Sequence, residues 1–301
     1  TLTPRVPWSF VTRAGLALSL AVALAPAPAS ACVTCGAGDP TLTVMGAEPP
    51  LAGRVRVSLG VSALWDRVGD VSLAEGRADL ALSVAPTDWL TLSASTPLVL
   101  RAVSEGPHGR FLTVGPGDTE VRARVVWLRD RAWAPSHVFG PTFGVRAPTS
   151  LDHADGQGLL PVDAQSGSGA FAAMPGLQYA WLVDPWSLFV SATVTLPFAG
   201  RYADTPGPSF ATTTAAQYRF DRALTVRAAV DTRLDAPATL GGRTDPRSDH
   251  FSLFVSPELL WSPAGDWILQ LGVRVPVLQV SEQGREEGWT VRAALTVDAE
   301  L

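Results

Sequence analysis

Polar and apolar residues alternate one by one along much of the chain after residue 52. The segment 53–65 divides into an apolar set and a polar set, namely Val55, Val57, Leu59, Val61, Ala63 and Trp65 against Arg54, Arg56, Ser58 and Ser62. The same division recurs at 187–200 and 289–300. Because successive side chains of a β-strand point to opposite faces, this period of two predicts strands with one apolar face.

Breaks rich in Gly, Pro and Asp separate about twelve such segments. The predicted strands are 53–65, 73–84, 89–101, 119–128, 137–149, 168–181, 187–200, 208–220, 223–235, 250–261, 267–280 and 289–300. Short turns are predicted at 85–88, 129–135, 184–187, 221–222 and 262–266. Longer connections are predicted at 66–72, 102–118, 150–167, 201–208, 236–249 and 281–288. Short and long connections therefore alternate, as in an up-and-down antiparallel sheet.

Tryptophan follows these boundaries closely. Seven Trp residues lie beside short turns: Trp89, Trp127, Trp133, Trp181, Trp186, Trp261 and Trp267. Trp65 and Trp289 lie beside long connections. Since indole rings prefer the headgroup level of a membrane, the pattern predicts an all-β protein, a single antiparallel transmembrane β-barrel of about twelve strands over 53–301. Both termini are then periplasmic. A soluble β-sandwich shares the alternation but does not explain the Trp positions.

The first residues have the features of an export signal. Arg5 and Arg13 precede or flank an apolar stretch at 14–25, and Ala29-Ser30-Ala31 offers small residues for cleavage. Residues 1–31 are therefore predicted to be a signal peptide, which places the barrel in the outer membrane of a Gram-negative bacterium. Outer-membrane lipid and the barrel-assembly machinery are the partners expected during insertion.

Residues 32–52 lie outside the strand pattern, and we expect them to form a periplasmic segment with the chain's two cysteines, Cys32 and Cys35. The C-x-x-C spacing allows a disulfide, a dithiol or a soft-metal site, and Cys32 also follows a cleavage sequence that permits lipidation. Gly36 stands where a c-type haem site needs His. No cofactor is expected.

Composition narrows the alternatives. The chain is 47% hydrophobic and 17% charged, yet no run after residue 31 approaches the 18 apolar residues of a transmembrane helix. The formal net charge is -5, and the sequence contains no basic tract. A nucleic-acid partner is therefore not expected.

The polar face of the predicted strands carries many charges. Its Arg residues are Arg54, Arg56, Arg77, Arg122, Arg124, Arg146, Arg227, Arg233, Arg274 and Arg292, and its acids are Asp79, Glu120, Asp231, Glu258 and Asp298. Ten cations against five anions predict an Arg-rich lumen that concentrates small anions. The alternative is that these Arg residues pair with the acids and fill a closed barrel.

An enzyme is not expected. Outer-membrane phospholipases place a His-x-Ser pair on a strand, and His250 and Ser252 have that spacing. However, the chain contains no Asn to orient the His, and His108, His137 and His153 share no metal-ligand spacing. The catalytic and metal sites are therefore predicted to be absent.

Two short stretches resemble a known family. The sequences GVRAPTS at 144–150 and AQSGSGAF at 164–171 are similar to segments of the outer-membrane barrels grouped with the transporter-like proteins of phenol meta-cleavage pathways. Ser150 and Ala170 replace a Gly and a Ser of the family pattern. The resemblance implies uptake of small, often apolar molecules. The expected function is an outer-membrane channel for small anionic or aromatic solutes, and the alternative is a non-conducting structural or surface-interaction barrel.

Overall fold

The computed structural model describes most of the chain from residue 52 onward. The described residues are 52–68, 71–104, 110–132, 135–155, 158–160, 164–198, 200, 205–240, 242–244, 248–264, 266–281 and 285–300. The predicted signal peptide, Cys32 and Cys35 lie outside these ranges. Among the described residues, no helix is long and apolar enough to span a membrane.

The described part of the chain contains eighteen β-strands. They are β1 (Arg54–Val68), β2 (Val71–Ala85), β3 (Leu90–Ser104), β4 (Arg110–Pro116), β5 (Thr119–Val125), β6 (Leu128–Arg129), β7 (His137–Ala147), β8 (Ala154–Asp155), β9 (Gly158–Leu159), β10 (Ala172–Val183), β11 (Trp186–Pro197), β12 (Ser209–Arg219), β13 (Leu224–Asp235), β14 (Thr239–Leu240), β15 (Arg243–Thr244), β16 (His250–Ala264), β17 (Trp267–Val280) and β18 (Arg285–Glu300). The short hairpins β8–β9 and β14–β15 stand apart from the main sheet.

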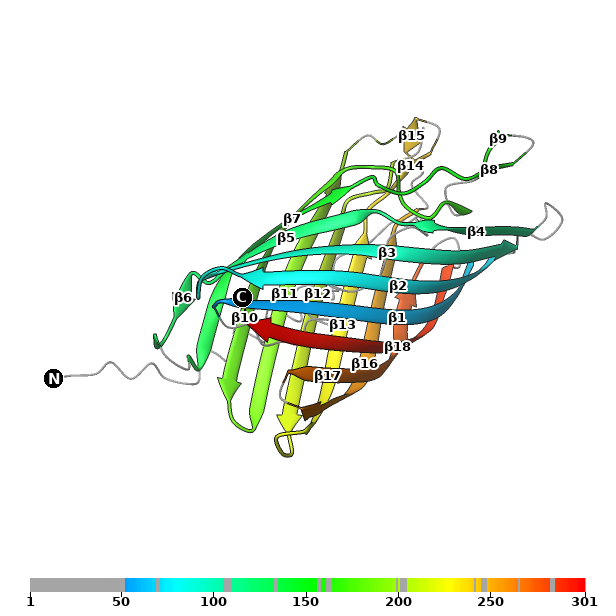
Figure 1. The fold of residues 1–301 in the computed structure, drawn as a ribbon. Helices are drawn as coiled ribbons and strands as arrows, with labels where there is room; N and C mark the ends of the chain where they lie inside the picture. Colours follow the sequence, from blue (N-terminus) through cyan, green and yellow to red (C-terminus); the bar gives the residue numbers. More distant parts are fainter. Residues whose placement is uncertain are drawn as a thin grey trace.

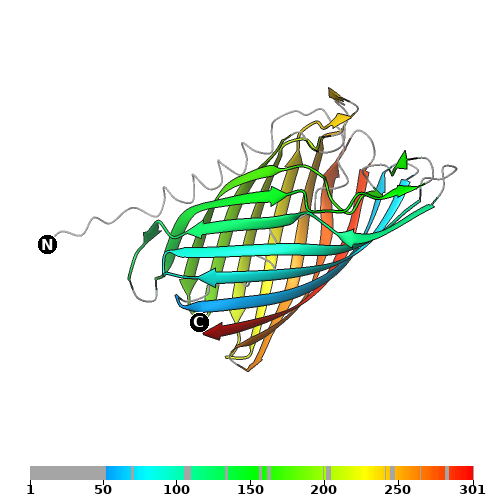
Figure 2. The same cartoon turned by 45° about the horizontal axis from the view of Figure 1, so that its top comes forward.

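The main sheet closes into a barrel (Figure 1). β1 pairs antiparallel with both β2 and β18, and β10 pairs with both β7 and β11. The pieces β4, β5 and β6 follow one another along a single wall position, so the fourteen strands of the sheet form twelve wall strands. Figure 2 shows the strands tilted around the wall. The predicted closed, antiparallel, twelve-stranded barrel is confirmed.

Several predicted connections differ from the observed ones; for example, β18 begins at Arg285, inside the predicted connection 281–288. β1 continues to Val68 and β2 begins at Val71, so most of the predicted connection at 66–72 is strand. Residues 110–116, predicted to be loop, form β4 and pair with the outer part of β3. Gly117 separates β4 from β5, and its backbone N–H donates to the Pro97 carbonyl oxygen at 2.8 Å. A Cβ at Gly117 would lie 2.7 Å from Pro97 Cγ, so the close approach requires glycine.

The two faces of the wall are inverted relative to a soluble protein. Leu59 and Leu80 on the outer face are 49% and 57% exposed, whereas Ser58 on the inner face is fully buried. A closed barrel leaves no sheet edge unpaired, and an apolar exterior with a polar interior is stable only against lipid. The chain is therefore an outer-membrane type of β-barrel.

Four tight connections define one end of the barrel, which we name the short-turn end: β2–β3, β10–β11, β12–β13 and β16–β17. Near this end, an apolar cluster packs on the inner face of β7 and β10–β13. It contains Val138, Ala180, Phe189, Ala215 and Ala229. Small and apolar side chains thus fill this part of the interior, while the charged side chains lie elsewhere on the inner wall.

The outward face of β2 gives a direct test of membrane insertion. Replacing Leu80, near the middle of β2, by Arg is expected to destabilise the barrel by about 2–4 kcal/mol, because the charge meets the bilayer midplane. Leu92, near the short-turn end of β3, is the matched control, and its replacement by Arg should cost only about 0–1 kcal/mol. Urea unfolding in lipid vesicles measures both. Equal costs at the two positions would contradict the predicted depth.

Candidate functional site

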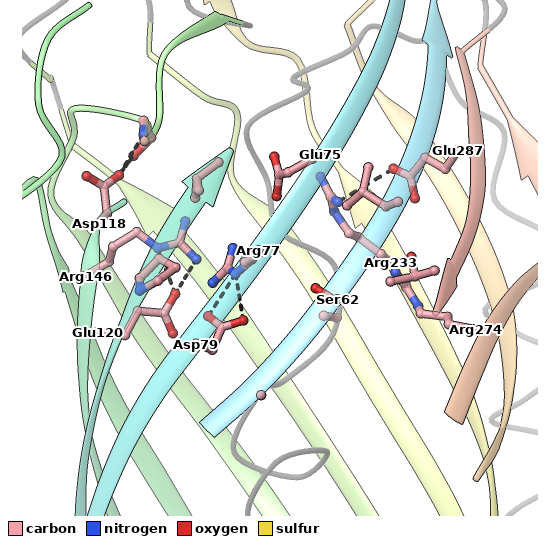
Figure 3. Close-up of a pocket in the computed structure, with 18 of the residues that line it drawn as sticks. Ser62, Glu75, Arg77, Asp79, Asp118, Glu120, Arg146, Arg233, Arg274 and Glu287 are labelled. Atoms are coloured by element: carbon pink, nitrogen blue, oxygen red, sulfur yellow. Dashed lines mark hydrogen bonds and ion pairs between the residues drawn. The ribbon is translucent and has the colours of Figure 1, made fainter. Parts of the chain in front are cut away.

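The barrel encloses a cavity of about 200 Å³. Side chains from both halves of the wall border it, as the labelled residues in Figure 3 show. Eight of the Arg and acid residues predicted for the lumen line the cavity: Arg77, Asp79, Glu120, Arg122, Arg146, Arg233, Arg274 and Arg292. The others occupy inner-face positions outside the cavity lining: Arg54, Arg56, Arg124, Arg227, Asp231, Glu258 and Asp298.

On the side formed by β2, β3, β5 and β7, the charges are paired. The ion pairs are Arg77–Asp79 at 2.8 Å, Arg101–Glu75 at 2.5 Å, Arg122–Glu120 at 3.1 Å and Arg146–Glu120 at 2.6 Å. Glu120 thus bridges two guanidinium groups from neighbouring strands. Each pair neutralises charge that burial would otherwise make expensive.

The side formed by β13, β16, β17 and β18 carries a second network. Its pairs are Arg227–Glu258, Arg292–Glu258 at 3.5 Å, Arg233–Asp235 at 2.5 Å, Arg233–Glu287 at 3.7 Å and Arg274–Asp231 at 3.7 Å. Nearer the short-turn end, Arg56 pairs with Asp298 at 2.5 Å. Arg54 lies 3.6 Å from Glu300. Ion pairs are therefore formed by nine of the predicted lumen Arg residues: Arg54, Arg56, Arg77, Arg122, Arg146, Arg227, Arg233, Arg274 and Arg292.

The inner wall is closer to neutral than the sequence predicted. Six further charged residues are buried on the inner face or line the cavity in the described part of the chain: Asp66, Glu75, Arg101, Asp118, Asp235 and Glu287. Glu75 and Arg101 lie on the inner face of predicted strands, so the alternation could have assigned both residues to the lumen. Asp118 and Glu287 fall in stretches predicted to be loops. These five acids against one Arg reduce the predicted excess of ten cations over five anions.

Arg274 differs from the other buried Arg residues in its contacts. Its guanidinium carbon lies 3.3 Å from the centre of the Phe254 ring, and the residue is 3% exposed. Its Nε and Nη2 atoms have no hydrogen-bond partner in the described part of the chain. Asp231, 3.7 Å from Nε, accepts hydrogen bonds from Thr213 at 2.7 Å and Ser256 at 3.2 Å.

The stretch 164–170 lies against the inner wall rather than beginning a strand, and we name it the inner segment. The strand predicted to start at 168 begins at Ala172. Asp118 accepts hydrogen bonds from the Ser168 N–H at 2.6 Å and the Ser168 hydroxyl at 2.7 Å. Arg101 donates to the Gln165 carbonyl oxygen at 2.5 Å. The Asp118 carboxylate at the β4–β5 break and the Arg101 guanidinium therefore fix the inner segment beside the cavity.

The other stretch used for the family resemblance meets the same break. The Ser150 N–H lies 3.4 Å from the Asp118 carboxylate. The Thr149 hydroxyl contacts the Thr119 hydroxyl at 2.8 Å and donates to the Gly117 carbonyl oxygen at 3.1 Å. Both stretches thus converge on residues 117–119, although the sequence separates them.

The described Trp residues lie at or near strand ends. Trp65, Trp89, Trp127, Trp186, Trp261, Trp267 and Trp289 are exposed, and Trp181 is half-buried. Trp133 lies outside the described residues. That these residues form an aromatic girdle at the membrane interface stays a prediction.

The His-x-Ser pair does not form a catalytic triad. His250 Nε2 lies 2.5 Å from Ser252 Oγ and 3.5 Å from Glu287 Oε1, and both His250 and Ser252 are buried. In a triad the acid orients the other ring nitrogen, Nδ1. Here the hydroxyl and the carboxylate approach the same nitrogen, so the required arrangement is not formed. Within the described ranges, no group of three or more potential metal ligands is present.

Comparisons with known proteins identify the fold. No family model and no curated protein sequence matches the chain. An outer membrane channel from Pseudomonas putida F1 has a TM-score of 0.67 and 14% identity, over 87% of this chain and 100% of that one. The NanC porin matches with a TM-score of 0.47 and 10% identity, over 81% and 100% of the two chains. A variant of the TodX monoaromatic hydrocarbon channel matches with a TM-score of 0.45 and 12% identity, over 84% and 91%. At these identities the similarity concerns the fold alone.

The inner segment gives a prediction about Asp118. Replacing Asp118 by Ala leaves the buried Ser168 N–H without its acceptor, which is expected to cost about 1–3 kcal/mol. Asp88, which forms an exposed ion pair with Arg129 at 2.6 Å, is the control, and its replacement by Ala should change stability by less than about 1 kcal/mol. The unfolding midpoint, followed by heat-dependent electrophoretic mobility, compares the variants. A drop for Asp88→Ala equal to that for Asp118→Ala would contradict the anchoring role.

Proposed function

We propose that the protein is an outer-membrane channel that admits small molecules. The observation that carries the proposal is the cavity of about 200 Å³ within a closed barrel, bordered by charged side chains. A purely structural barrel gains little from many buried Arg–carboxylate pairs, because apolar residues of similar volume are often as stabilising. A wall that contacts water and polar solutes gives these charges a use. The similarly folded Pseudomonas putida F1 protein is an outer membrane channel, which supports the same role here.

We propose that the solutes are small, because the cavity is smaller than the ~300–1,000 Å³ typical of sites for drug-sized ligands. The wall combines guanidinium groups with apolar residues such as Val99, Met174 and Phe254. This mixture suits organic anions or aromatic compounds with one polar group. The preference for anions is expected to be modest, since acids of the inner wall pair with most of the predicted Arg residues.

Reconstitution separates a channel from a non-conducting barrel. In planar bilayers the full chain is expected to give small, stable currents, and under a KCl gradient the zero-current potential should indicate a slight preference for chloride. Liposome swelling with small carboxylates measures uptake of organic solutes. A lack of both current and swelling would contradict the channel and favour the structural alternative. Current with a preference for potassium would overturn only the anion selectivity.

We also propose that the short-turn end faces the periplasm. β1 begins and β18 ends there, since Arg54 pairs in register with Glu300. Outer-membrane barrels generally have short periplasmic turns and longer extracellular loops. The signal peptide at 1–31 and the state of Cys32 and Cys35 stay predictions.

An inserted epitope tests this orientation. A tag placed at Gly242, in the connection that contains β14 and β15, is expected to bind antibody on intact cells. The same tag in the turn at 221–222 should bind antibody only after the outer membrane is permeabilised. The reverse labelling pattern would mean that the barrel is inserted in the opposite direction.

A further inference from the structure

The inner segment borders the cavity but belongs to no strand of the sheet. Hydrogen bonds to the wall hold it instead. Ser168 donates from its N–H and its hydroxyl to the Asp118 carboxylate, and the Ser166 hydroxyl donates to the Pro116 carbonyl oxygen at 2.9 Å. A Cβ at Gly167 would lie only 2.6 Å from Asp118 Oδ1, so the segment lies directly against the wall. The contact is therefore fitted and specific.

Gln165 ties the inner segment to the connection that precedes it. Its side chain is fully buried, accepts a hydrogen bond from the His153 N–H at 2.8 Å, and donates to the carbonyl oxygens of His153 and Leu160 at 2.9 Å and 2.8 Å. Its own carbonyl oxygen accepts a hydrogen bond from Arg101, which also pairs with Glu75 on the wall. The described parts of this connection thus form one hydrogen-bonded unit.

The inner segment forms one side of the cavity. Residues 166–168 line it, and so do Arg233 of β13 and Phe254 of β16. β13 and β16 lie six places from β3 and β5 in the order of the wall strands, which is the opposite side of a twelve-stranded barrel. Figure 3 shows Asp118 and Arg233 on opposite sides of this space. The inner segment therefore narrows the interior between two facing walls.

The strand number makes such a segment decisive for the width of the lumen. Barrels of about eight strands have an interior just wide enough for side chains, whereas barrels of about sixteen strands leave an aqueous channel. The twelve wall strands of this barrel lie between these limits. The wall is fixed by its ladder of backbone hydrogen bonds, but the inner segment depends on side-chain contacts, which open locally at lower cost. Its position therefore determines how much of the lumen is open.

We propose that the inner segment is the size-limiting constriction of the channel. Asp118 and Arg101 are its positioning residues, because their hydrogen bonds keep residues 165–168 against the wall. With the segment in place small solutes pass and larger ones are excluded, and release of the segment widens the passage. This inference deepens the proposed channel function and rests on it, since a constriction has a role only where solutes pass.

Two neutral sugars test the constriction by size alone. Arabinose is the small probe and sucrose is the larger one. Liposome swelling with the folded full chain is expected to be much faster in arabinose than in sucrose. The ratio of the sucrose rate to the arabinose rate is the quantity to compare, because it does not depend on how many barrels are inserted. Equal rates for the wild-type protein would mean that the interior holds no narrow constriction and would overturn the proposal.

Asp118→Ala removes the acceptor of both Ser168 donors. Losing such a contact shifts the equilibrium toward the released segment by at least about fivefold, so the sucrose-to-arabinose ratio should rise by a similar factor. Asp79→Ala is the matched control, because it also removes a cavity-lining carboxylate, but one that bonds to Arg77 on its own strand. The control should keep the wild-type ratio. An equal rise in both variants would refute the role of the inner segment.

Ser168→Ala tests the same contact without changing any charge. It removes one of the two hydrogen bonds to Asp118, so the ratio should lie between those of the wild-type protein and Asp118→Ala. Heat-dependent electrophoretic mobility shows which variants are folded, and Ser168→Ala carries the test if Asp118→Ala does not fold. An unchanged ratio in the folded variants would refute the constriction.

Arabinose entry distinguishes this inference from the function on which it rests. If arabinose enters the liposomes but the ratio is the same in every variant, the constriction is wrong and the channel stands. If neither current nor arabinose swelling is observed, the channel itself is wrong and the constriction falls with it.

Discussion

The whole architecture depends on satisfying polar groups away from water. In hydrocarbon an unpaired backbone N–H or C=O is expensive, so the sheet must close on itself, as β1 does with β18. Closure places every second side chain inside the barrel, where charge is also costly. The paired networks around Glu120 and Glu258 are the consequence of that second requirement. Membrane insertion and the chemistry of the interior thus have one physical origin.

Alternation predicted most of the fold because it records which face meets lipid. The strand bounds agree closely where one face is uniformly apolar, as in β11, observed at Trp186–Pro197. The alternation did not predict the break between β4 and β5. That break depends on a close contact between Gly117 and Pro97, which are twenty positions apart in the sequence. The alternation also could not place the inner segment, because Asp118 and Ser168 meet only after the barrel closes. Tertiary contacts, not local pattern, decide such positions.

The charged interior was likewise predicted only in part. The alternation pattern predicted which Arg residues face the interior, but it missed some of the acids. Asp118 and Glu287 were missed because they lie in stretches predicted to be loops. The pattern gave no sign of how well each Arg is satisfied. Arg56 and Arg274 have similar sequence surroundings on their strands. Arg56 donates two hydrogen bonds to Asp298, whereas Arg274 Nε lies 3.7 Å from Asp231, beyond hydrogen-bond distance. A nearly balanced wall is expected to attract anions only weakly.

The central claim is that ion pairs neutralise the charged side chains inside the closed barrel. A crystal structure of the full chain in a lipid mesophase tests it most directly. The account predicts that Glu120 lies between Arg122 and Arg146, and that Glu258 lies between Arg227 and Arg292. Carboxylates of Glu120 and Glu258 turned away from these Arg residues would contradict the account.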